Sequence, residues 1–383
     1  MSSIFAPLQR LFTSPHAIQP GIYHYQSPPD DPRNYRLHLR VENDGSAILI
    51  VNAATVLHLN QTAAEYAYYF VKNTPVNEVA RRVSRRYSVD AYQAAQDYNN
   101  LTERILTLIE TPDLDPVTFL DFEQRTPYAR KPTAPYRLDC ALTYRLPEGS
   151  DVQSAPTKRV DRELTTEEWK SIIDKVWQVG VPHVVFTGGE PTLRDDLPAL
   201  IAHAESNGQV SGLLTDGLRL AEEAYLYELL QTGLDHVMIV LQPEKDLAWN
   251  ALEKVLTADI FNAVHLTLTQ QNAPNLPGYL DRLAKMGCVA VSLTAQEIEL
   301  NATLLALRDQ AAALQMSLIW DLPVPYSAQN PVALETGGEG LMEGGGRAWL
   351  YVEPDGDVLP TQGVNRILGN ILKDPWENIW KQA

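Results

Sequence analysis

Cysteine is scarce in this sequence, with Cys140 and Cys288 as the two present among 383 residues. A pair of cysteines forms at most one disulfide, which excludes the framework of several disulfides found in small secreted proteins. Sparing use of cysteine is ordinary for proteins of a reducing compartment. We therefore expect a cytoplasmic protein.

Positive charge is also scarce. The chain has 31 lysines and arginines against 48 aspartates and glutamates, a net charge of −17. Binding to nucleic-acid phosphates needs clustered basic residues, so we expect no nucleic-acid partner. The one basic cluster comprises Arg81, Arg82, Arg85 and Arg86. It is either a solvated helix face or a docking patch for an acidic peptide.

Long apolar runs are missing too. The longest, such as residues 237–241, are far too short to cross a bilayer, and residues 1–20 have no continuous apolar core. We expect neither a membrane span nor a secretory signal. Apolar residues make up 45% and charged residues 21%, the balance of a soluble globular protein with two or three domains.

Residues 20–110 are predicted to form a small α+β domain, after a lead-in over residues 1–19. The first half alternates apolar and polar residues, as half-buried strands do. Apolar residues at helical spacing follow, and Asn60 or Thr62 is placed to cap the first helix. The pattern predicts strands at 35–41, 46–52 and 55–59, then helices at 63–72, 76–87 and 91–109.

Five prolines in residues 111–135 predict a linker. Over residues 136–325, strands then alternate with helices, which indicates a parallel sheet with right-handed crossovers. Six or seven such units either close into a barrel or remain partly open. The strands are expected at 138–144, 183–186, 210–214, 236–240, 264–269, 289–293 and 318–322, and the helices at 166–179, 197–206, 221–232, 248–256, 276–286 and 301–314.

Residues 326–383 are predicted to form a short extension. Glycines between 337 and 346 mark a loop, and residues 348–352 are expected to pair with 358–359 in a hairpin. The chain then ends in a short helix, with Trp376 and Trp380 spaced for packing on one face.

The most specific motif is Phe-Thr-Gly-Gly-Glu-Pro-Thr-Leu at residues 186–193. It follows a buried strand and precedes a helix, at the strand end where α/β barrels bind ligands. Gly188 and Gly189 allow backbone groups to approach a ligand closely. Glu190 is able to accept a hydrogen bond from an ammonium group.

Residues 187–191 resemble the motif with which radical S-adenosylmethionine (radical SAM) enzymes hold the amino group of that cofactor. Leu-Thr-Thr-Glu-Glu-Trp at 164–169 and Leu-Thr-Asp-Gly at 214–217 also resemble the superfamily, with Asp216 where asparagine is frequent. The resemblance covers residues 136–383 and implies a partial TIM-like (β/α)6 barrel. It also implies S-adenosylmethionine binding by Gly188, Gly189, Glu190, Pro191, Thr215 and Asp216.

The same superfamily holds a 4Fe-4S cluster with a CxxxCxxC loop after the first strand. Leu-Thr-Tyr-Arg at 142–145 is similar to the family, but Leu146, Ser150 and Gln153 stand at the cysteine positions. Leucine cannot ligate iron, and serine and amide are poor replacements for thiolate. Cys140 and Cys288 have the character of buried apolar residues. A 4Fe-4S cluster is therefore not expected.

Residues 351–360 resemble the signature of the SPASM or twitch extensions of peptide-modifying radical SAM proteins. Those extensions bind a second cluster through cysteines. Here Thr361 and Glu343 lie at or near the cysteine positions, so we expect a degenerate extension without a cluster.

Residues 20–110, with Leu-His-Leu-Asn-Gln-Thr-Ala at 57–63, resemble the winged-helix-like PqqD domain. In peptide-modifying systems that domain binds the precursor peptide as an added strand at its sheet edge, beside the last helix. The other interpretation is a generic α+β domain.

Three hypotheses follow. The first is a degenerate, cluster-free protein that binds a precursor peptide and partners an active radical SAM enzyme, in maturation of a ribosomally synthesised modified peptide (RiPP) or a cofactor. The second is an enzyme that uses S-adenosylmethionine without radicals, for example in methyl transfer. The sequence therefore leaves open whether the chain is an enzyme. The third, a metal-dependent hydrolase, is disfavoured because His183, His236 and His265 are expected at strand starts. Glu297 and Asp321 either line a pocket or lie in solvated loops.

Overall fold

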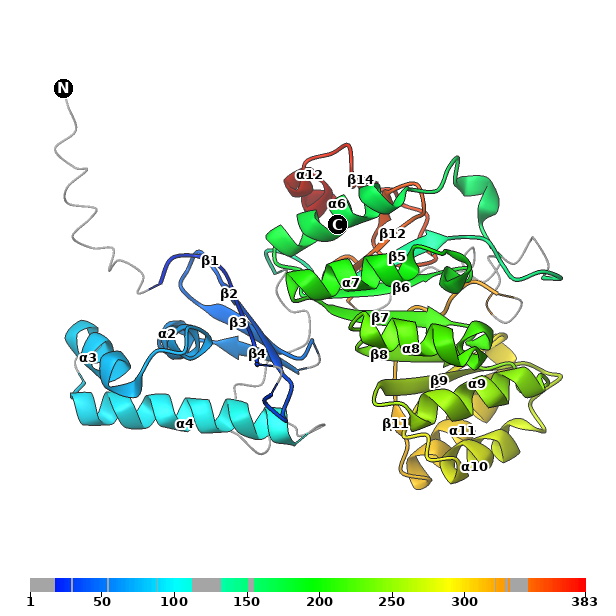
Figure 1. Cartoon of the computed structure of the whole chain (residues 1–383), viewed down its shortest axis with the longest axis horizontal. Helices are drawn as coiled ribbons and strands as arrows, with labels where there is room; N and C mark the ends of the chain where they lie inside the picture. The colour runs from blue at the N-terminus through cyan, green and yellow to red at the C-terminus, as the bar shows by residue number, and fades with distance from the viewer. Residues whose placement is uncertain are drawn as a thin grey trace. The chain divides into compact units, whose positions relative to one another are not determined.

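In the computed structural model the chain forms two compact units, which we call unit 1 (Met1–Ala129) and unit 2 (Arg130–Ala383) (Figure 1). The structure describes residues 18–28, 30–53, 55–87, 89–111, 132–150, 155–320, 322–327, 330 and 344–383. Most of the predicted lead-in and most of the predicted linker lie outside these ranges.

The described part of unit 1 begins with a four-stranded antiparallel sheet in which each strand pairs with the next. The first strand was not predicted: its sequence, Gly-Ile-Tyr-His-Tyr-Gln, has no buried residue to mark a core-facing side. The other three lie within one residue of their predicted ends. The strands are β1 (Gly21–Gln26), β2 (Arg36–Val41), β3 (Ala47–Val51) and β4 (Thr55–Leu59).

Three helices follow in unit 1, as predicted: α2 (Gln61–Val71), α3 (Val76–Arg86) and α4 (Ala91–Glu110). Asn60 caps α2, because its side chain accepts a hydrogen bond from the Ala63 N–H at 3.0 Å. One apolar core joins the sheet to α2 and the end of α4, and a second joins the three helices.

Unit 2 contains a parallel sheet with helices between successive strands. Six strands, β5 to β10, lie side by side in chain order, so each β-α-β step moves one place along the sheet. This is the predicted partial (β/α)6 barrel. Its strands are β5 (Arg137–Thr143), β6 (His183–Gly188), β7 (Val210–Thr215), β8 (His236–Val240), β9 (Phe261–Leu268) and β10 (Ala290–Ala295).

The barrel helices pack on the outward-facing side chains of these strands and form the largest apolar core. Thr165 begins the first helix with a capping box, in which Thr165 and Glu168 bond each other's backbone N–H groups. The helices are α6 (Thr166–Gln178), α7 (Leu197–Asn207), α8 (Glu223–Gln231), α9 (Asp246–Thr257), α10 (Leu276–Lys285) and α11 (Asn301–Ala313).

The end of the chain extends the same sheet. β12 (Trp349–Val352) pairs in parallel with β5. β13 (Asp357–Leu359) pairs with β12 in the predicted hairpin. β14 (Gly369–Asn370) and α12 (Trp376–Gln382) complete the extension. At the other edge, the strand expected at 318–322 is limited to β11 (Ser317–Leu318).

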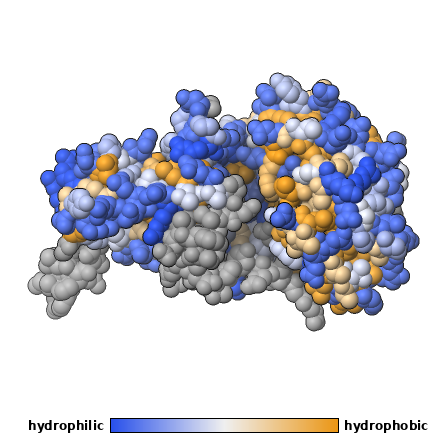
Figure 2. Space-filling view, turned by 90° about the horizontal axis from the view of Figure 1, so that it is seen from below, coloured by the Kyte–Doolittle hydropathy of each residue, from blue (hydrophilic) through white to orange (hydrophobic). Residues whose placement is uncertain are grey.

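Figure 2 shows hydrophobic residues gathered on the visible face of unit 2, whereas the visible face of unit 1 is mostly hydrophilic. None of the described helices has the length and apolar character needed to cross a membrane.

Candidate functional site

The turn after β6 packs against the chain that leaves β5. A Cβ at Gly188, where φ is 128°, would lie 2.2 Å from the Thr143 carbonyl oxygen, and one at Gly189 would lie 2.3 Å from that of Arg145. The Gly189 N–H donates to the Thr143 carbonyl at 2.8 Å, and the Glu190 N–H donates to that of Arg145 at 2.9 Å. The close approach that we expected toward a ligand is thus made toward protein backbone.

Glu190 joins the ends of β6 and β7. Its side chain is buried, and Oε1 accepts hydrogen bonds from the Thr192 N–H (2.9 Å) and hydroxyl (2.6 Å) and the Thr215 hydroxyl (2.7 Å). Oε2 accepts from the Asp216 N–H at 2.7 Å. Pro191 opens a short 3-10 turn, Pro191–Leu193. Glu190, Thr215 and Asp216, distant in sequence, therefore meet in one network.

Asp216 places a second carboxyl beside Glu190. Its Oδ1 accepts from the Leu218 N–H at 2.9 Å, whereas Oδ2 is buried and has no hydrogen-bond partner among the described residues. Burial, with the Asp216 charge, raises the pKa of Glu190 to about 8. Burial also raises the pKa of Asp216. Two adjoining carboxyls with an unpartnered oxygen suit a cationic donor such as ammonium.

A cavity of ≈ 230 Å³ opens beside these carboxyls, at the carboxyl ends of the barrel strands. Its lining includes residues 146–150, Glu190, Asp216, Lys245 and Tyr326. Pockets that enclose a drug-sized ligand measure roughly 300–1,000 Å³, so this one holds a small group or part of a larger ligand.

Lys245 and Tyr326 were not foreseen. Lys245 immediately precedes α9, and its charge opposes the upward shift in the pKa of Asp216. The Tyr326 N–H donates to the Gly188 carbonyl at 2.7 Å, which holds this residue over the turn. No motif surrounds either residue, because tertiary packing alone brings them to the cavity.

The loop after β5 has an apolar residue, Leu146, at the first position where a 4Fe-4S cysteine would stand. Leu146 is half-buried and packs on a cluster that includes Tyr144, Ala155 and Tyr326. Ser150 is exposed, and its N–H closes a turn onto the Pro147 carbonyl at 3.1 Å. Gln153 lies outside the described residues.

Both cysteines are buried thiols. Cys140 lies in β5 within the core under the helices, and Cys288 precedes β10 in the same core. Burial raises the pKa of each thiol, well above its ordinary value for Cys140. A thiol kept protonated in an apolar core is not a metal-binding thiolate. Across the part of the chain that the structure covers, no three His, Cys, Asp or Glu residues are grouped to hold a metal ion.

The C-terminal hairpin has a hydrogen bond where the resemblance would place a cysteine. The Thr361 hydroxyl is buried and accepts from the Trp349 indole N–H at 3.1 Å. Glu353, at the end of β12, accepts from the Tyr144 hydroxyl at 2.9 Å and pairs with Arg159. Glu343 lies outside the described residues.

One of the three histidine predictions was wrong. His183 and His236 open their strands, with their Nε2 atoms 2.7 Å apart, but His265 lies inside β9. It is buried between the hydroxyls of Thr267 and Ser292, each 3.0 Å away, and burial lowers its pKa to about 3. It is therefore a neutral core residue at physiological pH.

Glu297 contributes to another cavity, of ≈ 630 Å³, beside the ends of β8 and β9. The Gln270 amide donates to its carboxylate. Asp321 lies outside the described residues.

Comparison with known proteins gives a consistent family signal. The Radical SAM superfamily model matches residues 140–243, which run from within β5 to just past β8 and include the turn at Glu190. A PqqA peptide cyclase of Streptomyces rochei is 32% identical over 287 residues, 64% of this chain and 76% of the relative. A PqqA peptide cyclase of Granulibacter bethesdensis is 28% identical over 282 residues, 65% of this chain and 73% of the relative.

Solved structures are similar in fold. Streptococcus suis SuiB bound to its precursor peptide SuiA has a TM-score of 0.58 at 14% identity, over 93% of this chain and 88% of that chain. The same protein bound to S-adenosylmethionine has a TM-score of 0.57 at 16% identity, with the same coverage.

Proposed function

Because this chain belongs to the radical SAM superfamily, we propose that it is a member without a 4Fe-4S cluster. It acts as a peptide-binding or partner subunit in RiPP-type peptide maturation or in cofactor maturation. The names of its relatives support a peptide substrate, since they are PqqA peptide cyclases. So does the fold that it shares with a protein solved with a precursor peptide.

The donor set of the loop after β5 carries the proposal. Three thiolates hold the cluster in the superfamily. This chain has Leu146, Ser150 and Gln153 at those positions, and both of its cysteines are buried in the core. Leu146 also packs with tyrosines, which leaves an apolar surface where soft anionic ligands are needed. The residues present do not fit a 4Fe-4S cluster.

The flanking regions extend the proposal. Residues 20–110 act as a PqqD-like peptide-recognition domain, joined by a linker at 111–135 to the barrel at 136–325. Residues 326–383 are a degenerate SPASM or twitch extension, in which the Thr361 hydrogen bond replaces cluster ligation. A separate radical SAM enzyme, as partner, supplies the redox chemistry in the cytoplasm.

Anaerobic reconstitution with iron and sulfide, followed by iron counting, tests the missing cluster. We expect almost no iron bound to the natural chain. The matched variant carries Leu146→Cys, Ser150→Cys and Gln153→Cys together, and we expect it to bind up to about four irons per chain. About four irons on the natural chain would overturn the proposal.

The second candidate function is an enzyme that binds S-adenosylmethionine and uses it without radicals. The adjoining carboxyls of Glu190 and Asp216 favour it, because they line the cavity and the methionyl ammonium is a cation that such a pair can hold once ionised. The bound cofactor would supply an electrophilic methyl group. The residues proposed to hold its amino end are Gly188, Gly189, Glu190, Pro191, Thr215 and Asp216.

Calorimetry with S-adenosylmethionine tests this candidate. Since the pKa of Glu190 is about 8, its carboxyl is mostly protonated at neutral pH and must ionise to pair with ammonium. Binding should release a proton, so the heat should depend on the ionisation enthalpy of the buffer. The Glu190→Ala variant should show no heat of S-adenosylmethionine binding. No heat at millimolar ligand would rule the candidate out and leave the first proposal standing.

A further inference from the structure

A pocket of arginines and tyrosines lies in unit 1, far in sequence from the barrel motif. Its volume is ≈ 610 Å³, within the range of ligand-binding pockets. The residues before β1, the strand itself, α2 and α3 all contribute to its walls. The lining consists of Ile18, Gln19, Tyr23, Tyr68, Tyr69, Arg82, Arg85 and Arg86.

The tyrosines form one continuous aromatic wall. The ring of Tyr23 in β1 meets that of Tyr68 edge to face, with centroids 4.8 Å apart, and Tyr68 meets Tyr69 in the same way at 5.6 Å. The Tyr23 hydroxyl donates to the Gln19 carbonyl at 2.9 Å, and this hydrogen bond ties the strand to the residues before it that also line the pocket. Packed tyrosines offer rigid contact area at little entropic cost.

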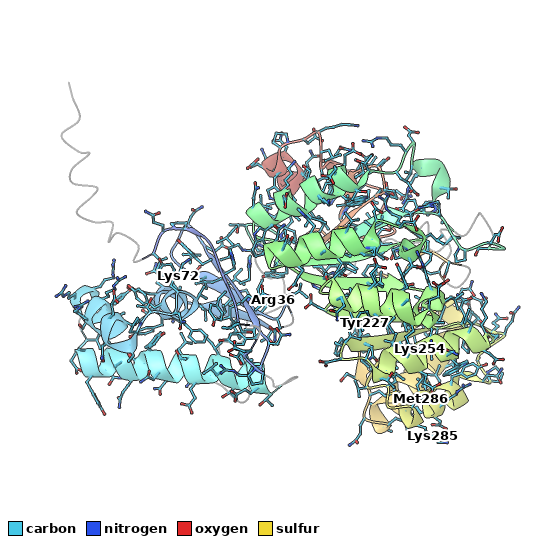
Figure 3. All side chains as sticks on the ribbon, in the orientation of Figure 1. Arg36, Lys72, Tyr227, Lys254, Lys285 and Met286 are labelled. Atoms are coloured by element: carbon cyan, nitrogen blue, oxygen red, sulfur yellow. The ribbon has the colours of Figure 1, made fainter. Side chains whose placement is uncertain are left out.

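Positive charge exceeds negative charge around this wall. Lys72, which follows α2 and is labelled in Figure 3, lies with its ammonium 5.3 Å from the centroid of the Tyr23 ring. The Arg82 guanidinium lies 5.6 Å from the Tyr69 ring centroid and pairs with Glu78. Arg85 is exposed and makes no ion pair with any described residue.

Arg86 pairs with a buried carboxylate, that of Glu65. Its Nε lies 3.6 Å from Glu65 Oε1, which also accepts from the Tyr69 hydroxyl at 3.0 Å. The Glu65 side chain is fully buried, so its charge acts within the domain while the pocket presents guanidinium groups. The pocket and its surroundings therefore hold four cationic side chains, those of Lys72, Arg82, Arg85 and Arg86. Two carboxylates lie beside them, those of Glu65 and Glu78.

We propose that this pocket binds the carboxylate side chains of an acidic peptide segment. Guanidinium forks match carboxylates and phosphates alike, so the shared chemistry is an oxyanion. A peptide is favoured because the tyrosine wall suits side-chain packing.

This inference rests on the proposed peptide-binding role of unit 1 but concerns another surface. The strand-addition site expected from the PqqD-like resemblance lies at a sheet edge beside the last helix, α4. The arginine-tyrosine pocket lies at β1, α2 and α3. One extended peptide bound at both surfaces would be selected by strand pairing at one and by charge at the other.

Fluorescence anisotropy of the full chain with a labelled glutamate-rich peptide tests the inference. We expect Arg85→Gln to weaken binding about tenfold, because it removes one charge-assisted hydrogen-bond donor. Arg81→Gln is the matched control: Arg81 is on the same helix and exposed but does not line the pocket. It should change binding less than about twofold, the effect of a screened surface charge.

Three results would overturn the inference: equal loss in the two variants, equal binding of a glutamine-matched peptide, or displacement by inorganic phosphate at the concentration of the peptide. Hydrogen exchange separates this inference from the proposed function. Protection of residues 21–26 by the glutamate-rich peptide supports the pocket. Protection confined to β4 and α4 would refute the pocket while supporting a peptide-recognition domain.

Discussion

The ends of β5 and β6 lie against each other and differ in character. After β6, a buried carboxyl collects four hydrogen bonds and joins two strands. After β5, Leu146 packs on tyrosines and Ser150 lies in solvent. The first turn has a structural role that needs no ligand. Neither of the described cluster positions after β5, Leu146 and Ser150, joins two strands in this way, so the side-chain network that ties neighbouring strands together belongs to the turn after β6.

The largest test of this comparison is Gly188→Ala. The added Cβ would meet the Thr143 carbonyl oxygen at 2.2 Å, in a backbone conformation that L side chains rarely adopt. We expect a loss of about 3–5 kcal/mol in the free energy of unfolding, measured in urea. Gly278→Ala is the control, because it lies in α10 with open space around it and should change stability by at most about 1 kcal/mol. Equal effects would show that the two ends are not tightly packed.

A second test uses pH. Burial and the Asp216 charge raise the pKa of Glu190 to about 8, above its unfolded value of about 4.3. The folded state therefore binds this proton more tightly, and the associated stability is lost as pH rises from about 4.3 through 8. We expect Glu190→Gln to flatten the fall in unfolding temperature across that window in scanning calorimetry. Parallel pH profiles for the two proteins would contradict this assignment.

The smallest effects are expected in the loop after β5. Leu146→Ala should cost about 1–2 kcal/mol, less than a fully buried leucine, because the side chain is half-buried. Ser150→Ala should stay within about 0.5 kcal/mol, since its side chain is exposed. Urea unfolding measures both. A Ser150 effect as large as that of Leu146 would point to a structural role that the loop does not show.

Much of the barrel could be predicted because its signals are local. Buried strands, the capping box at Thr165 and the αL glycine after α7, Gly208, each fix an element within a few residues. β1 escaped prediction because none of its residues is fully buried: Tyr23 and Tyr25 are half-buried, whereas His24 and Gln26 are exposed. The strand expected at 318–322 is shorter because its pairing with β10 ends at Ile319, whose N–H donates to the Val291 carbonyl at 2.9 Å.

The candidate site was only partly predictable. The motif at residues 186–193 identified Glu190 and its neighbours. Thr215 and Asp216, at the end of the next strand, hydrogen-bond to Glu190 in the same network. Lys245 and Tyr326 line the cavity through long-range packing that no local pattern records. The wall of Tyr23, Tyr68 and Tyr69 was equally invisible, since it joins a strand to a helix more than forty positions away.

The pairing of β12 with β5 has a consequence for synthesis of the chain. Trp349 aligns with Arg137, whose guanidinium lies 4.9 Å from the centre of the indole ring, and Val352 aligns with Cys140. While the ribosome is still translating the preceding region, the leading strand of the barrel has one neighbour and an open edge. Such edges invite pairing with other chains, so β5 stays open on that side until residues 349–352 have emerged.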